Sequence, residues 1–359
     1  MKNILVISLV GLKFNGVTSV IYNYCNNMNR SGINFTFLAY NDIPKEICDK
    51  FKKIGNIIIV PNRKKDLKNY IKSLKQIMTN NYFDVVHIHG NSFTMLIEAS
   101  LAKKSKVKKI IVHSHSTNCD HPFLNKLFKN KLQKKATNLI ACSKKSGEWL
   151  YGKSNYIILN NAIDIDNFTY KEDIRKKIRN TFNINDKDIV LGHVGHFTIE
   201  KNHKFLLDIF KEYHKINNNS KLLLIGEGPL FETIKNTIYE LNLQGSVLLL
   251  GKRKDVNDIY QAMDIFVLPS LWEGLPLVMI EAQSSGLPCL VSSNVTEDAK
   301  CIEQVYYDDL SKSDTDWAND IQKIINKKFD RNINTKNIIT KKGFNITKEA
   351  ELLRKIYIE

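Results

Sequence analysis

The segment from Leu268 to Ser293 constrains the fold more than any other part of this sequence. A short apolar run, Asp264 to Leu268, leads into it, as expected of a strand that is buried on both faces. Turn-forming residues follow, and Pro276 suits the first turn of a helix that Gly286 ends. A second apolar run then begins. The pattern predicts strand, loop, helix and strand, and in an open parallel sheet such a loop lies at the carboxyl ends of the strands, where ligands bind.

Two glutamates bracket this loop. Glu273 lies within it, and Glu281 lies about a turn and a half into the predicted helix, so both side chains can reach one crevice. Between them is the helix N-terminus, whose free backbone N–H groups suit an anion. A diphosphate at the helix end, with a carboxylate on either side to accept sugar hydroxyls, makes a coherent nucleotide-sugar site. From spacing alone, two solvated glutamates explain the pattern equally well, because charged residues are usually exposed.

The run E-G-L-P-L-V-M-I-E from Glu273 to Glu281, with the A-x-x-x-G-x-P pattern after it, resembles the signature of the retaining glycosyltransferases of family 4. Other landmarks follow the order of that family: Gly16 after the first strand, N-A-I-D at 161–164, V-G-H-F-T-I-E-K-N-H at 194–203 and G-E-G-P at 226–229. The likeness covers nearly the whole chain and is greatest to the branch that builds bacterial exopolysaccharides and capsules. It implies an α/β protein with the GT-B fold, in which two Rossmann-like, doubly wound parallel-sheet domains face a central cleft.

The domain organisation follows from the same strand–helix rhythm in both halves of the chain. We expect an acceptor-binding domain over residues 1–163, a nucleotide-sugar-binding domain over 164–340 and a terminal segment over 341–359. Polar, turn-forming residues before Asp164 suit the boundary. Apolar residues at helical spacing from Ile346 to Ile358 predict a last helix, and the resemblance implies that this helix returns to the first domain.

Positive charge gathers in the first half of the chain. Residues 1–160 hold 26 lysines and arginines against 8 acidic residues, whereas residues 161–359 hold 27 against 29. A basic first half suits a polyanionic partner, such as an anionic membrane face, a lipid diphosphate or a nucleic acid. A lysine-rich genome is the alternative explanation.

The expected location is the cytoplasm, with association at the inner face of the plasma membrane as an extension of that expectation. Six scattered cysteines with no C-x-x-C pair favour reduced thiols over a zinc site or a disulfide framework. No apolar run approaches the length of a membrane span. The stretch from Phe123 to Lys135 predicts a basic amphipathic helix that could lie on an anionic bilayer, but the same periodicity fits a surface helix packed on its own sheet.

Two histidine pairs end predicted strands of the first half, His87 with His89 and His113 with His115. Alternation puts both members of each pair on one face of their strand. Such pairs can ligate a metal, but no acidic residue accompanies them, and we expect no metal site. The resemblance implies that His115 lies near the donor sugar or the reacting centre, while His87 and His89 are interpreted as ordinary residues at a strand edge.

The resemblance also assigns residues to the donor. Lys201 is expected to reach the diphosphate, whereas His196 stands where the family usually has an arginine. A histidine cannot form the two-pronged contact of an arginine with phosphate, so donor binding should be weaker or more pH-dependent, unless a basic residue such as Arg253 substitutes. Glu281 is assigned to the ribose hydroxyls and Glu273 to the transferred sugar.

Backbone groups complete the expected site. The amides of Gly274 and Leu275 are expected to meet the diphosphate. The turn at Gly16 is expected to let the backbone approach the donor phosphates and the acceptor. Asn15 stands where a second glycine is common in the family, and asparagine also tolerates positive φ. The residues expected to be catalytic are thus Glu273, Lys201 and His115.

The expected reaction transfers a sugar, with retention, from a nucleotide-sugar to a saccharide or a polyprenyl-diphosphate-linked saccharide. The resemblance implies a UDP-linked donor rather than a GDP-linked one, because UDP-sugars are the usual donors in the family. Cationic side chains and the helix end would stabilise the leaving diphosphate, so no metal cofactor is expected. Two carboxylates could act in double displacement only if both lay at the anomeric carbon. If Glu281 holds ribose it cannot do so, and the same-face attack that the family suggests is favoured.

Two other functions share some of these features. A GT-B sugar-nucleotide epimerase would have the same sheets and diphosphate pocket but would need no separate acceptor. A basic, non-catalytic nucleic-acid-binding protein would show strongly salt-dependent binding. No recognisable nucleic-acid module is present in the sequence, so nucleic acid is not an expected partner.

Overall fold

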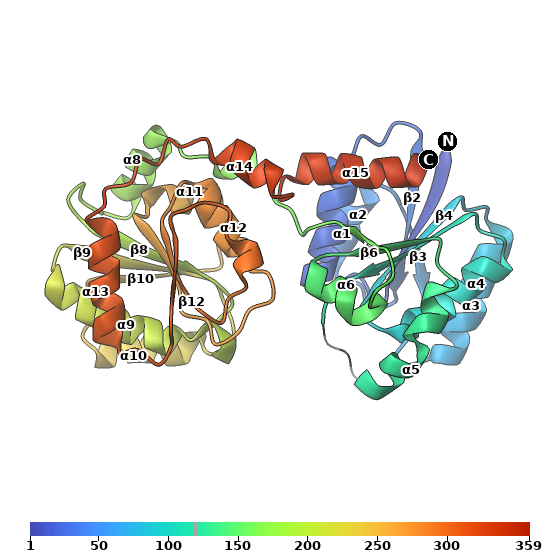
Figure 1. Ribbon diagram of the computed structural model, residues 1–359, viewed down its shortest axis with the longest axis horizontal. Helices are drawn as coiled ribbons and strands as arrows, with labels where there is room; N and C mark the ends of the chain where they lie inside the picture. Colours follow the sequence, from blue (N-terminus) through green and yellow to red (C-terminus); the bar gives the residue numbers. More distant parts are fainter. Residues whose placement is uncertain (118, 120) are drawn as a thin grey trace. The chain divides into compact units, whose positions relative to one another are not determined.

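The computed structural model describes residues 1–117, 119 and 121–359. The chain forms two compact units, an N-terminal unit of residues 1–162 with 345–359 and a C-terminal unit of residues 163–344. Each unit is built on one parallel sheet with helices on both faces (Figure 1). The predicted fold class, two Rossmann-like doubly wound domains, is confirmed.

The N-terminal sheet has the strand order β3-β2-β1-β4-β5-β6-β7, and all neighbouring strands are parallel. The strands are β1 (Lys2–Ser8), β2 (Ile33–Tyr40), β3 (Asn56–Val60), β4 (Val85–Gly90), β5 (Lys109–Ser114), β6 (Asn138–Ala141) and β7 (Ile157–Ile158). The helices of this unit are α1 (Gly16–Asn27), α2 (Lys45–Lys52), α3 (Leu67–Asn80), α4 (Leu96–Lys104), α5 (Pro122–Gln133), α6 (Lys144–Tyr151) and α15 (Ile346–Ile358). Because β1 and β4 are neighbours, the winding direction reverses between them, and ligands of such sheets bind at the carboxyl ends of these strands.

The C-terminal sheet has the strand order β10-β9-β8-β11-β12-β13, again all parallel. The strands are β8 (Ile189–Val194), β9 (Ser220–Ile225), β10 (Val247–Gly251), β11 (Ile265–Leu268), β12 (Cys289–Ser292) and β13 (Val305–Asp308). The helices are α7 (Ile165–Phe168), α8 (Glu172–Thr181), α9 (His203–Ile216), α10 (Phe231–Glu240), α11 (Val256–Ala262), α12 (Leu277–Ser284), α13 (Asp314–Ile325) and α14 (Thr335–Lys341). Here the winding reverses between β8 and β11.

Apolar clusters lie on the two faces of each sheet. Because the central strands are buried on both faces, their sequences are continuous apolar runs. All four residues of β11 are fully buried. In the C-terminal unit, α9 packs beside α13 on one face, and α8 packs beside α11 on the other. This layering fixes the loops at the carboxyl ends of the strands, where polar residues can gather.

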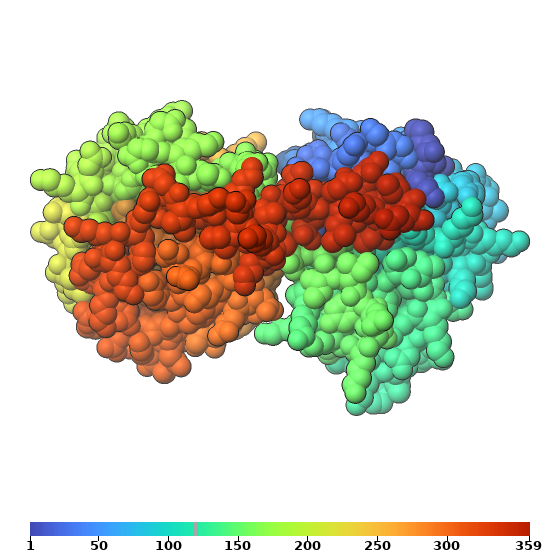
Figure 2. All heavy atoms as spheres, turned by 45° about the horizontal axis from the view of Figure 1, so that its top comes forward, coloured from blue at the N-terminus to red at the C-terminus, as the bar shows by residue number. Residues whose placement is uncertain are grey.

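The last helix, α15, belongs to the N-terminal unit. Asn345 caps it by accepting hydrogen bonds from Thr347 N and Lys348 N, at 3.0 Å and 3.4 Å. Leu353 and Tyr357 then join the apolar cluster of α1 and the central strands. Figures 1 and 2 show this helix, in red, beside the blue N-terminal residues. None of the helices in the described ranges is long and apolar enough to cross a membrane.

Candidate active site

Lys201 and Glu273 follow the two strands between which the C-terminal sheet reverses. β8 leads through Gly195 to Lys201, and β11 leads through Ser270 to Glu273. β8 and β11 pair directly, with Leu191 opposite Ile265. The two loops therefore leave the same edge of the sheet at neighbouring strands, which is where doubly wound sheets bind ligands.

Lys201 and Glu273 form an ion pair between these loops. The Nζ of Lys201 donates to Oε1 of Glu273, and the two side chains are only 15% and 12% exposed. Ser270 Oγ donates to the same carboxylate oxygen at 3.0 Å. Two of the three residues expected to be catalytic thus meet, and a serine that the sequence analysis did not single out orients one of them.

Two further hydrogen bonds, one from a side chain and one between backbone groups, hold the two loops together independently of the ion pair. Asn202 Nδ2 donates to Pro269 O at 3.1 Å, and Leu271 N donates to Glu200 O at 2.8 Å. Gly195 lies against the lysine, because a Cβ there would come within 3.4 Å of Lys201 Cδ. The loops are therefore packed in a fixed arrangement, as a site that must position a ligand requires.

Glu281 projects from α12 toward α11. Its Oε2 is 3.1 Å from the hydroxyl of Tyr260, and that hydroxyl is also 3.1 Å from Val278 O. Burial raises the pKa of Glu281 to about 7, although the hydrogen bond with Tyr260 opposes the rise. Tyr260 has a single proton to share between two acceptors. In the structure the hydroxyl of Tyr260 donates to Glu281, so the raised pKa comes from burial.

The loop between the two glutamates presents backbone donors. α12 begins at Leu277, and Pro276 before it gives no side-chain cap. Within the part of the chain that the structure describes, the N–H groups of Gly274 and Leu275 have no hydrogen-bond partner. Gly274 is exposed, and a Cβ there would meet nothing within 4 Å. This end of α12 can therefore receive an anion.

The other two residues assigned to the donor lie apart from the ion pair. His196 is exposed in the loop after β8. Arg253 follows β10, the edge strand of the sheet, and its guanidinium binds the carboxylate of Asp255 at 2.9 Å and 2.6 Å. Over the described residues, no hydrogen bond or ion pair joins His196 or Arg253 to Lys201 or Glu273.

The N-terminal unit has a pocket of about 490 Å³ at the carboxyl ends of its central strands. It is lined by Leu9 and Val10 after β1, by Val17 on α1, by Arg63 and Lys64, by Gly90 to Thr94 at the end of β4, and by His89, His115, Ser116, Cys119 and His121. His115 thus lies in a pocket in which nine of the fifteen lining residues have polar side chains. We name this cavity the polar pocket.

The turn before α1 borders the polar pocket and corrects one expectation. Asn15 has φ −151°, an extended conformation, and its side chain caps α1 by accepting from Thr18 N at 2.9 Å. The idea that asparagine supplies positive φ here is wrong, because its role is that of an N-cap. Gly16 has open space around it, since a Cβ would meet nothing within 4 Å. A ligand could therefore approach the backbone at this turn.

The four histidines of β4 and β5 gather on one face of the N-terminal sheet, as alternation predicts. His89 Nδ1 is 2.8 Å from His115 Nε2, and His87 Nδ1 is 2.7 Å from the hydroxyl of Tyr357 on α15. Burial lowers the pKa of His115 to about 4 and those of the other three well below the usual value of 6.5. β4 is a central strand, so the interpretation of His87 and His89 as residues at a strand edge is wrong.

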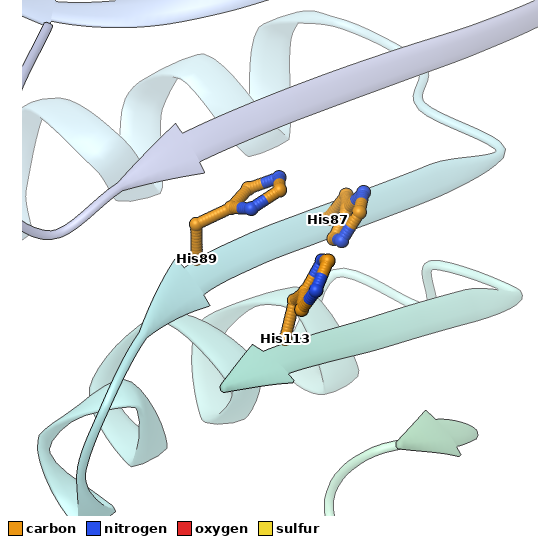
Figure 3. A group of neighbouring side chains, drawn as sticks. All are labelled: His87, His89 and His113. Carbon is orange, nitrogen blue, oxygen red and sulfur yellow. The ribbon is translucent and has the colours of Figure 1, made fainter. Parts of the chain in front are cut away.

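Three of these histidines could hold a metal ion. One ring nitrogen from each of His87, His89 and His113 lies within 4.8 Å of the others (Figure 3). The group contains no acidic residue, so no carboxylate would offset the charge of a divalent ion at this buried position. The expectation of no metal therefore stays a prediction.

A buried ion pair beside the polar pocket was not anticipated from the sequence. Glu98 on α4 is fully buried, and its Oε1 accepts from Arg63 Nε at 2.8 Å. Arg63 Nη2 also donates to Thr94 O at 2.8 Å. Burial raises the pKa of Glu98, and the charge of Arg63 opposes that rise. The one sequence signal was a lone glutamate in the apolar stretch from Met95 to Ala102.

Both units are doubly wound. The C-terminal unit has a lysine–carboxylate pair at the point where its sheet reverses, and the N-terminal unit has the polar pocket at the carboxyl ends of its strands. This combination defines a GT-B protein. The chain belongs to the glycosyltransferases of group 1 and family 4. The family model described as "Glycosyl transferases group 1" matches residues 174–341, and that described as "Glycosyltransferase Family 4" matches residues 14–167. The resemblance seen in the sequence is thereby confirmed.

Individual relatives agree with this membership. The glycosyltransferase EpsF of Bacillus subtilis (strain 168) is 31% identical over 303 residues, which cover 80% of this chain and 79% of that protein. An Escherichia coli UDP-Gal:alpha-D-GlcNAc-diphosphoundecaprenol alpha-1,3-galactosyltransferase is 30% identical over 328 residues, 82% of this chain and 80% of that protein. The crystal structure of Anabaena HepE in complex with UDP superposes with a TM-score of 0.73 at 16% identity, covering all of this chain and 96% of that one. At that identity, the likeness to HepE establishes the fold.

Proposed function

We propose that this glycosyltransferase transfers a sugar from a UDP-sugar to a lipid-linked saccharide, with retention, in the synthesis of a surface polysaccharide. The observation that carries the proposal is the Lys201–Glu273 pair at the reversal point of the C-terminal sheet. The relatives support the substrate classes, since one is named for a UDP-galactose donor and a diphosphoundecaprenol acceptor. HepE, which shares the fold, binds UDP.

The donor diphosphate would be held by Lys201, by the N–H groups of Gly274 and Leu275 and by the start of α12. Each of these supplies positive charge or a donor where negative charge grows on the leaving group. Glu281 would accept hydrogen bonds from the ribose hydroxyls, and Glu273 would accept them from the sugar being transferred. His196 and Arg253 would act through longer-range attraction, because Arg253 is already engaged by Asp255.

Retention by a same-face attack would follow from this assignment. An acceptor hydroxyl forms a bond to the anomeric carbon as the bond to the diphosphate oxygen breaks. The leaving diphosphate takes the electron pair, and its oxygen takes the proton of the acceptor hydroxyl. Glu281 is tied to Tyr260 and is assigned to ribose, so only Glu273 remains near the sugar, and double displacement by two close carboxylates is disfavoured. The transfer is proposed to need no metal.

The N-terminal unit would bind the acceptor and contribute His115. Because burial lowers the pKa of His115 to about 4, its imidazole is neutral at physiological pH and suits a sugar hydroxyl rather than a phosphate. The excess of lysine and arginine in residues 1–160 would attract an anionic lipid acceptor.

Contact with an anionic membrane surface is part of the proposal and is supported by α5. Phe123 and Leu127 are 72% and 56% exposed, although they are large and apolar. Exposed lysines lie beside them, including Lys126 and Lys131. An apolar patch with a cationic border suits the interface of an anionic bilayer. The proposed location is the cytoplasmic face of the membrane, in keeping with six free cysteines.

The test is a transfer assay in which the purified protein is given a panel of UDP-sugars and an undecaprenyl-diphosphate saccharide, with and without a chelator. We expect one UDP-sugar to extend the acceptor with its anomeric configuration kept, and chelation to leave the rate unchanged. Inversion of configuration, or dependence on added metal, would contradict the mechanism. Exchange of the sugar without any acceptor would favour an epimerase, and tight salt-dependent binding of polynucleotides without transfer would favour the nucleic-acid alternative.

A further inference from the structure

An apolar groove runs between α3 and α4 in the N-terminal unit. It has a volume of about 470 Å³. Its walls are the apolar side chains of Leu67, Ile71, Leu96, Ile97 and Leu101, together with Phe93 before α4. Leu67 is 43% exposed, and the others are partly buried, so the groove is open to solvent. An open groove with apolar walls can receive an apolar ligand.

The groove adjoins the polar pocket. Arg63, Phe93 and Thr94 line both cavities, so the guanidinium of Arg63 lies at the boundary between them. At its other end the groove adjoins a further cavity of about 370 Å³, with Leu101 and Lys104 in common. From the strand ends outward, the surface is therefore first polar, then cationic, then apolar.

Arg63 is fixed at this boundary by its neighbours. Its hydrogen bonds to Glu98 and Thr94 orient the planar guanidinium but use only part of its donor set. Glu98 is fully buried, and a buried carboxylate of this kind is costly to a fold unless it is paired. An arginine held in this way can meet a phosphate with little loss of side-chain freedom.

We propose that the groove between α3 and α4 binds the first isoprene units of the acceptor's polyprenyl chain, with the acceptor's diphosphate at Arg63 and its saccharide in the polar pocket. The proposal rests on the proposed function and names where the acceptor binds. A lipid-linked saccharide has the same order of chemistry as this surface: hydroxyl groups, then two phosphates, then an apolar chain. A groove of this volume is in the range of small-ligand sites, so the rest of the chain lies outside it.

The kinetic test compares two acceptors that carry the same saccharide diphosphate, one with an undecaprenyl chain and one with a methyl group in place of that chain. We expect Ile71→Gln to raise KM for the undecaprenyl acceptor about tenfold and to leave KM for the methyl acceptor unchanged, because a methyl group is too short to reach into the groove. Arg63→Gln should raise KM about tenfold or more for both acceptors. Lys72→Gln, an exposed position on the same helix, is the matched control and should change neither. Equal effects of Ile71→Gln on the two acceptors would overturn the proposal.

Photo-crosslinking of the unmodified protein tests the groove without needing turnover or a variant. A benzophenone-bearing prenyl diphosphate should label peptides that contain 67–71 and 96–101, in competition with undecaprenyl diphosphate. Labelling confined to α5 would show that the chain lies on the membrane-facing helix instead, and would overturn the proposal. Labelling of the groove without any sugar transfer would refute the proposed function while leaving the groove assignment standing.

Discussion

Lys201 and Glu273 lie 72 positions apart in the sequence, and their side chains form an ion pair at the carboxyl edge of the C-terminal sheet. The pair joins the loops after β8 and β11, the neighbouring strands between which the winding of the sheet reverses. Each member thereby keeps the other in place before the donor binds. The two residues have different proposed roles, and these roles can be separated by experiment.

Glu273→Ala should lower kcat by about 100-fold, because it removes the group proposed to contact the transferred sugar. The Kd for UDP should change by less than about threefold, since Lys201 and the backbone donors stay. Lys201→Ala should instead weaken UDP binding about tenfold or more, because it removes the proposed charged partner of the diphosphate. Lys204→Ala, an exposed lysine on α9, is the control. Steady-state kinetics and calorimetry measure both quantities, and equal effects of the two variants on kcat and Kd would refute the separate roles.

The affinity for UDP should rise with pH through the titration of Glu281. Burial raises the pKa of this carboxyl to about 7, so part of the population is protonated near neutrality. Ribose hydroxyls donate to the ionised form, so UDP binding favours loss of the proton and tightens between about pH 6 and pH 8. Glu281→Gln cannot ionise. The phosphates of UDP titrate alike with both proteins, so the difference between the two affinity curves isolates Glu281, and parallel curves would contradict its place at the ribose.

The same shift has the opposite consequence for folding without a ligand. In the unfolded chain Glu281 has its ordinary pKa, near 4.5, so its carboxyl ionises at a lower pH in the unfolded chain than in the folded protein. The contribution of Glu281 to the free energy of unfolding should therefore decrease as the pH rises from about 4.5 to 7. In urea denaturation over this range, the free energy of unfolding of the unmodified protein minus that of Glu281→Gln should decrease as the pH rises, and a constant difference would show that Glu281 is not buried in this way.

The buried histidines should make the N-terminal unit sensitive to acid. Burial lowers the pKa values of His87 and His113 well below 6.5, so these rings stay neutral in the fold, whereas the unfolded chain takes up protons below about pH 6.5. As the pH decreases below this value, the free energy of unfolding should fall by about 1.4 kcal/mol per pH unit for each such histidine. His113→Leu should reduce this slope in urea denaturation of chelator-treated protein, while His121→Leu, an exposed position, should not. An unchanged slope in His113→Leu would contradict the neutral, buried state.

Removal of the apolar patch on α5 should weaken membrane binding. Phe123→Ser combined with Leu127→Ser takes away two large exposed apolar side chains and leaves the lysines, so co-sedimentation with anionic vesicles should fall about tenfold or more. Tyr239→Ser, which alters a side chain that is 58% exposed in the C-terminal unit, is the matched control. Equal binding by all three proteins would remove α5 from the proposed membrane contact.

Much of the fold could be predicted from local patterns. The last helix runs from Ile346 to Ile358, as its apolar spacing predicts, and β11 begins one residue after the start of the apolar run from Asp264 to Leu268 that predicts it. The edge strands β3 and β13 escaped notice. β13 is partly exposed and has only one valine and two tyrosines before Asp308, so its apolar run is weak, whereas β3 contains the apolar run Ile57 to Val60 and could have been predicted.

The site was only partly predictable because its supporting contacts join distant positions. Glu273 and Lys201 could be named from motifs, but the Ser270 and Tyr260 hydroxyls that orient the two glutamates carry no such signal. Arg63 and Glu98 are 35 positions apart, and their pairing depends on how α4 packs. The meeting of four histidines likewise required the pairing of β4 with β5, which the sequence does not specify.

The most direct test of the central claim, that the C-terminal unit binds UDP through Lys201 and Glu281, is calorimetric titration with UDP, GDP and ADP. The unmodified protein should bind UDP best, and Lys201→Ala and Glu281→Ala should each weaken that binding about tenfold or more while leaving the melting temperature near that of the parent. Binding of UDP that neither substitution changes, or a clear preference for another nucleotide, would contradict the account.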